Sequence, residues 1–129
     1  MNSFSKYSKS ECRRYGIMMR MSGGNMYNVG DVVLSVIPFT DSSQVKIRPA
    51  VILYEKHGNF VVAGVTSNER MDGVSLTQKE GLPFDSIIKT NYIFTITKIG
   101  IKRKLTQLSR VKRAELHTAL THHLEGLTD

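Results

Sequence analysis

Tryptophan is absent from this chain of 129 residues, cysteine occurs once and proline three times. With Cys12 alone, no intrachain disulfide and no cysteine cluster for zinc can form, so a reducing, cytoplasmic setting is expected. No segment approaches the roughly 18 apolar residues of a membrane-spanning helix, and the N-terminus carries no apolar block of a signal peptide. These absences favour a soluble, unprocessed protein without a membrane partner.

Motifs for metal and cofactor chemistry are missing as well. No glycine-rich loop of the G-x-x-x-x-G-K-[ST] or G-x-G-x-x-G type occurs, and the carboxylates show no spacing that assembles a metal cage or a dyad. His117 and His122 are five residues apart, which does not match the i, i+4 pair of a helical metal site, and His57 belongs to an expected turn. We therefore expect neither a metal nor a cofactor.

The chain has an excess of positive charge. It holds 18 Lys and Arg against 11 Asp and Glu, for a formal net charge of +7. This excess favours a polyanionic partner, and nucleic acid before membrane because no basic helix with a broad apolar face accompanies it. A solvated basic surface without such a partner is the alternative that the composition leaves open.

The N-terminal residues differ from the rest. Residues 1–28 mix Ser, Lys and Arg without a period of two or 3.6 and contain the pair Gly23 and Gly24, which predicts a flexible basic tail before one domain of residues 29–129. An alternative is translation from a later methionine, at Met18, Met19, Met21 or Met26.

The domain reads as a series of strands followed by one helix. We expect strands at residues 30–38, 49–54, 60–66, 74–76 and 86–97, and one around Ile101 with Lys102 and Lys104 on its polar side. Residues 40–46 are expected to form a long loop, and Gly58 with Asn59 a tight turn. A C-terminal helix is expected with Ser109 as N-cap, Gly126 as C-terminal stop and an apolar stripe of Leu116, Ala119, Leu120, His123, Leu124 and Leu127. The plan is mainly β: a small barrel or strongly bent sheet closed by one helix.

Polar groups stand at one end of the central hairpin. Arg48 immediately precedes the first strand, and Thr66 and Ser67 stand at the end of the second, so antiparallel pairing places them side by side. A guanidinium offers a planar fork that matches two phosphate oxygens, and hydroxyls add donors to the same oxygens. From the residues alone, an ordinary edge arginine remains the other interpretation.

Three ordered elements, the stretch "GDVVLSVIPF", the Arg-Pro of "KIRPAVIL" and the Thr-Ser of "VVAGVTSN", carry a resemblance to the PemK/MazF family of toxins from toxin–antitoxin systems. Together with "SIIKTNYIFTIT" and the final helix "LSRVKRAELHTAL", the resemblance runs from about Gly30 to Leu124. It implies an SH3-like barrel of the CcdB/PemK/MazF type with a C-terminal α-helix and a homodimer. It also implies a metal-independent endoribonuclease for single-stranded RNA, neutralised by a cognate antitoxin protein with which it binds DNA.

The same resemblance implies site residues. Arg48 matches the family's catalytic arginine, Thr66 the threonine that works with it, and Ser67 follows in that motif. Supporting RNA contacts are implied for Gln44, Lys46, Lys89 and Asn91. Two departures stand out: Val45 and Lys46 replace a frequent Gly-Gly, and Lys89 and Asn91 stand where some members have an arginine and an acid.

Two alternatives of a different class stay open from the sequence. One is a barrel of the same fold that acts by binding a protein, as CcdB-like gyrase inhibitors do, and the other is a nucleic-acid binder that does not cut. Neither alternative requires Arg48 together with Thr66.

Overall fold

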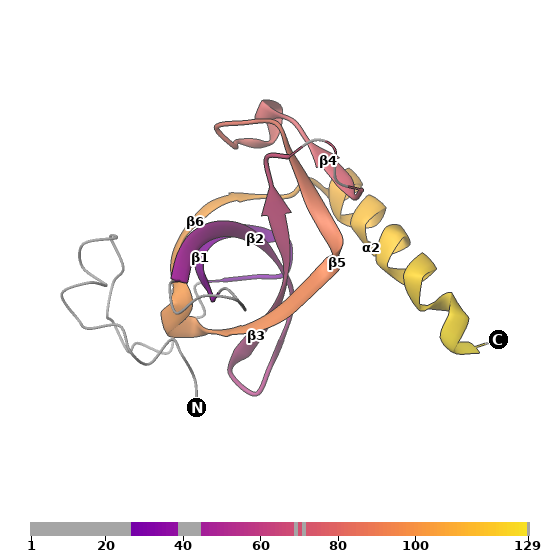
Figure 1. The fold of residues 1–129 in the computed structure, drawn as a ribbon, viewed down its shortest axis with the longest axis horizontal. Helices are drawn as coiled ribbons and strands as arrows, with labels where there is room; N and C mark the ends of the chain where they lie inside the picture. The colour runs from indigo at the N-terminus through magenta and orange to yellow at the C-terminus, as the bar shows by residue number, and fades with distance from the viewer. Residues whose placement is uncertain (1–26, 39–44, 69, 71, 129) are drawn as a thin grey trace.

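The computed structural model describes residues 27–38, 45–68, 70 and 72–128. Most of the predicted basic tail, and Gln44 in the predicted loop, lie outside the described residues. The strands are β1 (Asp31–Pro38), β2 (Val45–Lys56), β3 (Asn59–Thr66), β4 (Val74–Leu76), β5 (Ser86–Thr97) and β6 (Ile101–Gln107). Among the described residues, the 3₁₀ turns η2 (Gln78–Glu80), η3 (Lys98–Gly100) and η4 (Glu125–Thr128) accompany the helix α2 (Arg110–Leu124) (Figure 1).

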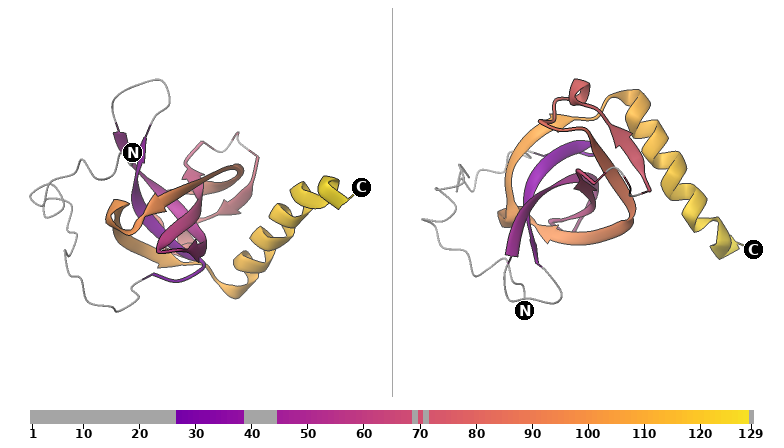
Figure 2. Two further views of the ribbon diagram at one scale, coloured as in Figure 1. Left: turned by 90° about the horizontal axis from the view of Figure 1, so that it is seen from below. Right: turned by 45° about the horizontal axis from the view of Figure 1, so that its top comes forward.

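The six strands form one antiparallel sheet in the order β4-β5-β3-β2-β1-β6. The sheet curls on itself, and α2 leaves it at one side (Figure 2). This architecture confirms the expected mainly β fold, a small barrel or strongly bent sheet with one C-terminal helix. Consecutive strands β1, β2 and β3 are neighbours, and the hairpin of β2 and β3 lies in the middle of the sheet.

Irregular pairing bends the strands. The register shifts between Ile52 and Tyr54 on β2, and twice along β1 where it pairs with β6. An extra residue on one strand of a pair increases the local twist and coil, which lets a short sheet wrap around a core.

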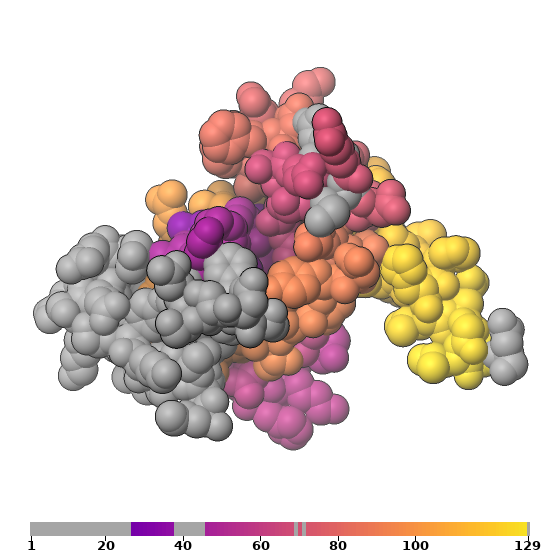
Figure 3. All heavy atoms as spheres, viewed as in Figure 1, coloured from indigo at the N-terminus to yellow at the C-terminus, as the bar shows by residue number. Residues whose placement is uncertain are grey.

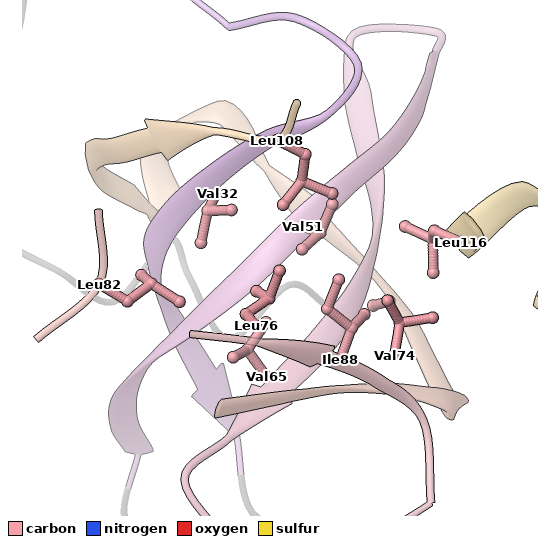
Figure 4. Close-up of a cluster of buried hydrophobic side chains, with 10 residues drawn as sticks. Val32, Val51, Val65, Val74, Leu76, Leu82, Ile88, Leu108 and Leu116 are labelled. Atoms are coloured by element: carbon pink, nitrogen blue, oxygen red, sulfur yellow. The ribbon is translucent and has the colours of Figure 1, made fainter. Parts of the chain in front are cut away.

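Side chains from the two faces of the sheet fill two apolar clusters. Val33, Ala50, Phe60 and Val62 belong to the cluster on one face, with Ile96 and Ile101 among its other members. Val32, Val51 and Ala63, each next in sequence to a residue of the first cluster, belong to the second cluster. Val65 belongs to the second cluster as well (Figure 4). Because both faces are buried, β1 and β3 are apolar on both sides.

Asp31 fixes the start of β1. Its side chain is fully buried, accepts hydrogen bonds from the backbone N–H of Asn28 (2.8 Å) and from Nε2 of Gln107 (3.0 Å), and pairs with Nζ of Lys104 at 3.3 Å. Tyr27, just before, packs edge-on against Phe60 with ring centroids 6.1 Å apart. Burial, and to a lesser degree the charge of Asp31, raises the pKa of Tyr27. These contacts tie the first described residues to β6 and to the core.

The C-terminal helix packs its apolar side chains on the barrel between Leu116 and Leu120. The side chain of Ser109 accepts a hydrogen bond from the N–H of Lys112 (3.2 Å), which confirms the predicted N-cap. Leu116 is buried, and Ala119 and Leu120 are partly buried against the same cluster. Leu124 is 59% exposed and Leu127 82% exposed, because the end of α2 stands away from the barrel (Figures 1 and 3).

Four local expectations are wrong. The helix passes into η4, so Gly126 lies inside a 3₁₀ turn and Glu125 is the C-cap. The hairpin turn uses positive φ at His57 (54°) and Gly58 (83°) and leaves Asn59 in β3, because Lys56 pairs with Asn59.

The remaining two concern strand residues. Val45 and Lys46 belong to β2 rather than to a loop, since they pair with Pro38 and Ile37. Lys102 is only 2% exposed, so it does not contribute to a polar side of β6 as Lys104 does.

Candidate active site

A hollow of about 600 Å³ opens at the end of the sheet where β2 begins and β3 ends. Its lining comes from β1, β2, β3 and the residue after it, the loop before β5, and β5 as far as Tyr92. The residues are Ile37, Ile47, Arg48, Pro49, Gly64, Val65, Thr66, Ser67, Leu82, Pro83, Phe84, Ser86, Lys89 and Tyr92. The predicted residues Arg48, Thr66, Ser67 and Lys89 therefore share one concave surface.

Strand register explains why Arg48 and Thr66 meet. Ala50 pairs with Gly64 in the antiparallel β2–β3 ladder. Arg48, two residues before Ala50, and Thr66, two residues after Gly64, therefore lie at the same level. Residues two apart in a strand point to the same face, and both line the hollow. Pro49 lies between Arg48 and Ala50, and it has no N–H to give to the ladder.

The polar groups of the site are only partly engaged. One terminal nitrogen of the Arg48 guanidinium, Nη1, donates to the carbonyl of Ile47 (3.0 Å), and the Arg48 side chain is exposed. Oγ1 of Thr66 accepts a hydrogen bond from the N–H of Asn68 (3.1 Å), which leaves its own hydrogen to donate elsewhere. The Arg48 backbone is fixed from the other side, where the Ser35 hydroxyl donates to its carbonyl (3.3 Å). A rigid backbone thus presents side-chain donors toward the hollow, and such donors suit an anionic ligand.

A long bulge in β5 brings Lys89 and Tyr92 to the same place. Ala63 pairs with Ile93 and Val65 with Ile88, so five steps along β5 oppose two steps along β3. In a regular strand, residues three apart point to opposite faces, but here Lys89 and Tyr92 both line the hollow. The ammonium nitrogen of Lys89 lies 4.6 Å from the centre of the Tyr92 ring.

Other predicted residues are placed differently. Lys46 and Asn91 are exposed but do not line the hollow, and Gln44 lies outside the described residues. Lys102, expected on the polar side of its strand, is buried, whereas Arg103 on β6 is exposed.

Sequence reasoning missed the aromatic part of the site. Tyr92 and Phe84 line the hollow beside Arg48, and neither was a candidate. The only available signal was their proximity in sequence to Lys89, and a strict alternation along β5 would have assigned Tyr92 to the other face.

The described histidines lie apart from the hollow. His122 contacts Glu125 (Nδ1 to Oε1, 2.9 Å) and His123 contacts the Thr90 hydroxyl (Nε2 to Oγ1, 2.9 Å) on the surface of α2. Among residues 27–38, 45–68, 70 and 72–128, no three His, Cys, Asp or Glu side chains gather into a metal-binding group. In the same residues, no helix is long and apolar enough to cross a membrane.

Known proteins share both this sequence pattern and this fold. Residues 28–124 match the family described as PemK-like, MazF-like toxin of type II toxin-antitoxin system. The endoribonuclease MazF of Staphylococcus epidermidis is 33% identical, over 74% of this chain and 88% of its own length.

Two solved structures share the fold at low identity. The Mycobacterium tuberculosis toxin MazF-mt6 superposes with a TM-score of 0.62 at 22% identity, covering 74% of this chain and 96% of that one. An endoribonuclease from mycobacterial species, solved in complex with its cognate antitoxin, superposes with a TM-score of 0.61 at 16% identity. The match covers 78% of this chain and 95% of that one. On the family match and the staphylococcal relative, this chain belongs to the PemK-like, MazF-like toxins of type II toxin–antitoxin systems.

Proposed function

We propose that this toxin is an endoribonuclease that cuts single-stranded RNA in the hollow, with Arg48 and Thr66 as its catalytic residues. The observation that carries the proposal is the convergence of Arg48, Thr66, Ser67 and Lys89 on one concave surface. Three elements supply these donors, and each kind of group binds phosphate oxygens well. Family membership and the 33% identical relative named as an endoribonuclease support the same activity.

The reaction needs no nucleophile from the protein. The 2′-oxygen of the RNA attacks the adjacent phosphorus, its proton passes to water, and the 5′-oxygen leaves and takes a proton from water. The products are a 2′,3′-cyclic phosphate and a 5′-hydroxyl. Negative charge grows on the phosphoryl oxygens in the transition state, and this is the charge that preorganised donors stabilise most.

Each residue has a separate role. The exposed Arg48 guanidinium grips two oxygens at once and stabilises the developing charge, because a guanidinium keeps its proton in proteins. Thr66, oriented by the N–H of Asn68, donates its hydroxyl hydrogen to one of the same oxygens. Ser67 and Lys89 hold the neighbouring phosphate.

Partners follow from the same proposal. A cognate antitoxin would neutralise the toxin by covering the hollow, and the toxin would act as a homodimer in the cytoplasm. The basic charge of the chain suits RNA and an acidic segment of an antitoxin alike. A related endoribonuclease in complex with its antitoxin supports the pairing.

The test is cleavage of a long single-stranded RNA by the purified protein in EDTA, with fragment ends identified by mass spectrometry. Arg48→Ala is expected to lower the single-turnover rate about 100- to 1000-fold, as removal of one charge-stabilising donor does. Arg48→Lys should recover only part of the loss, since an ammonium lacks the planar fork. The matched control is Arg103→Ala, because Arg103 is an exposed arginine outside the hollow. This variant should cut RNA at the rate of the parent.

Two results would contradict the proposal. If the RNA stays intact with the parent protein at every salt concentration, the protein is not a nuclease. Growth arrest that persists in a folded Arg48→Ala variant would mean that the barrel acts by binding a target.

A further inference from the structure

The hollow has an aromatic surface that the phosphate chemistry does not use. Tyr54, Phe84 and Tyr92 are the aromatic side chains with more than a third of their surface exposed among the described residues, and two of them line the hollow. Tyr92 is 37% exposed and Phe84 is 65% exposed. A partly exposed ring in a concave site is suited to a planar apolar ligand group.

The Tyr92 ring is held in place from several sides. Gly64 lies so close that a Cβ there would come within 2.7 Å of Cδ2 of the ring, so the ring packs on bare backbone. The Phe94 ring lies 5.1 Å away at an angle of 44°. Tyr92 is therefore a rigid surface that loses little side-chain entropy when a ligand binds.

Cationic groups surround this surface. The Lys89 ammonium lies over the Tyr92 ring, 4.6 Å from its centre, and Arg48 lines the same hollow. A ligand that satisfies both features carries a phosphate for the cations and a flat apolar ring for Tyr92, which is the chemistry of a nucleotide. When it binds, Lys89 exchanges the exposed cation–π contact for a phosphate oxygen, which is the stronger partner for an ammonium.

We propose that Tyr92 is the platform on which one base of the RNA stacks beside the cleaved phosphodiester, with Phe84 as a second aromatic surface of the same base site. The inference rests on the proposed RNA cleavage and adds the group that positions the nucleotide. Tyr92 binds and positions the substrate, and it takes no part in proton transfer or charge stabilisation. Because only an unpaired base can leave its stack and lie on a side chain, Tyr92 also favours single strands over duplexes.

The experiment measures affinity without cleavage. Short single-stranded DNA homopolymers lack the 2′-hydroxyl and cannot be cut, and their binding is followed by fluorescence anisotropy for the parent and the variants Tyr92→Ala, Tyr92→Leu and Tyr92→Phe. Cleavage of single-stranded RNA is measured in parallel. Tyr54→Ala is the matched control, a tyrosine that is 50% exposed and outside the hollow.

Loss of one base–aromatic stack predicts a weakening of about 5- to 150-fold in Tyr92→Ala. Tyr92→Leu, which still packs on Gly64, should weaken as much, whereas Tyr92→Phe and Tyr54→Ala should match the parent. In RNA cleavage the loss should appear in kcat/KM. Replacing one base by an abasic site should weaken the parent but not Tyr92→Ala.

The outcomes separate this inference from the proposed activity. If the parent cuts RNA and Tyr92→Ala and Tyr92→Leu bind and cut as well as the parent, the base site is wrong and the nuclease stands. If the parent binds DNA through Tyr92 but cuts no RNA, the base site stands and the nuclease is wrong. Equal weakening in Tyr54→Ala, or no binding by the folded parent, would overturn the base site.

Discussion

At the scale of single residues, the site depends on what arginine, threonine and glycine each permit. Arg48 supplies a fixed fork of donors, and Thr66 supplies one hydroxyl whose acceptor side is already used by Asn68. Gly64 on β3 contributes because it has no side chain, which leaves room for the Tyr92 ring. Its φ is not among the positive values, so space rather than backbone conformation explains glycine here.

The Gly64→Ala substitution tests this directly. The new methyl would lie 2.7 Å from Cδ2 and 3.3 Å from Cε2 of Tyr92, so the ring must shift away from β3. We expect weaker binding of single-stranded DNA, comparable to Tyr92→Ala, with a change in the free energy of unfolding below about 2 kcal/mol. Fluorescence anisotropy measures the affinity for single-stranded DNA, and urea denaturation measures the free energy of unfolding.

Gly126→Ala is the matched control, because nothing lies within 4 Å of a Cβ at that exposed position. Equal affinity in Gly64→Ala and the parent would show that the packing of the Tyr92 ring on Gly64 has no role in binding.

At the scale of elements, the strands position the site and the helix covers one core. The alternation and apolar runs of the sequence were sufficient to predict β1, β3, β4 and the long β5, because burial on one or both faces determines those patterns. The meeting of Arg48 and Thr66 followed from antiparallel pairing alone.

Two features of the elements were beyond sequence reasoning. The bulge of β5, which turns Tyr92 into the hollow, is a register difference between two strands and leaves no sign in the residues of either one. Burial of Lys102 depends on how tightly β6 curls against β1, where two further register shifts occur.

The helix gives a prediction about stability. Leu116→Ala removes a buried side chain that contacts the second cluster and should lower the free energy of unfolding by about 2–4 kcal/mol. Leu124→Ala, two turns further along α2 and 59% exposed, should change it by less than about 0.5 kcal/mol. Urea denaturation of both variants makes the comparison, and equal losses would mean that the end of α2 is covered in solution.

At the scale of the whole molecule, one compact barrel carries the family match, the hollow and both clusters. The match begins at residue 28, and Tyr27 is already packed against Phe60. We therefore propose that the domain begins near these residues, as the change of composition in the sequence predicts.

Deletion of residues 1–25, which leaves Met26 as the start, tests the boundary. The truncated protein should keep the urea midpoint of the full chain and its rate of RNA cleavage, because the contacts of Tyr27 and Asp31 remain. A fall in either quantity would place part of the folded or active unit before residue 26.

In our proposal, the beginning of β2 and the end of β3 form one active site. The most direct measurement is a double-mutant cycle on the single-turnover rate of RNA cleavage, with Arg48→Ala, Thr66→Val and the double variant. If both residues hold the same phosphoryl group, the double variant should be slower than Arg48→Ala by much less than the factor that Thr66→Val alone costs. Strictly multiplicative losses would contradict the account, since they would mean that the two residues act independently.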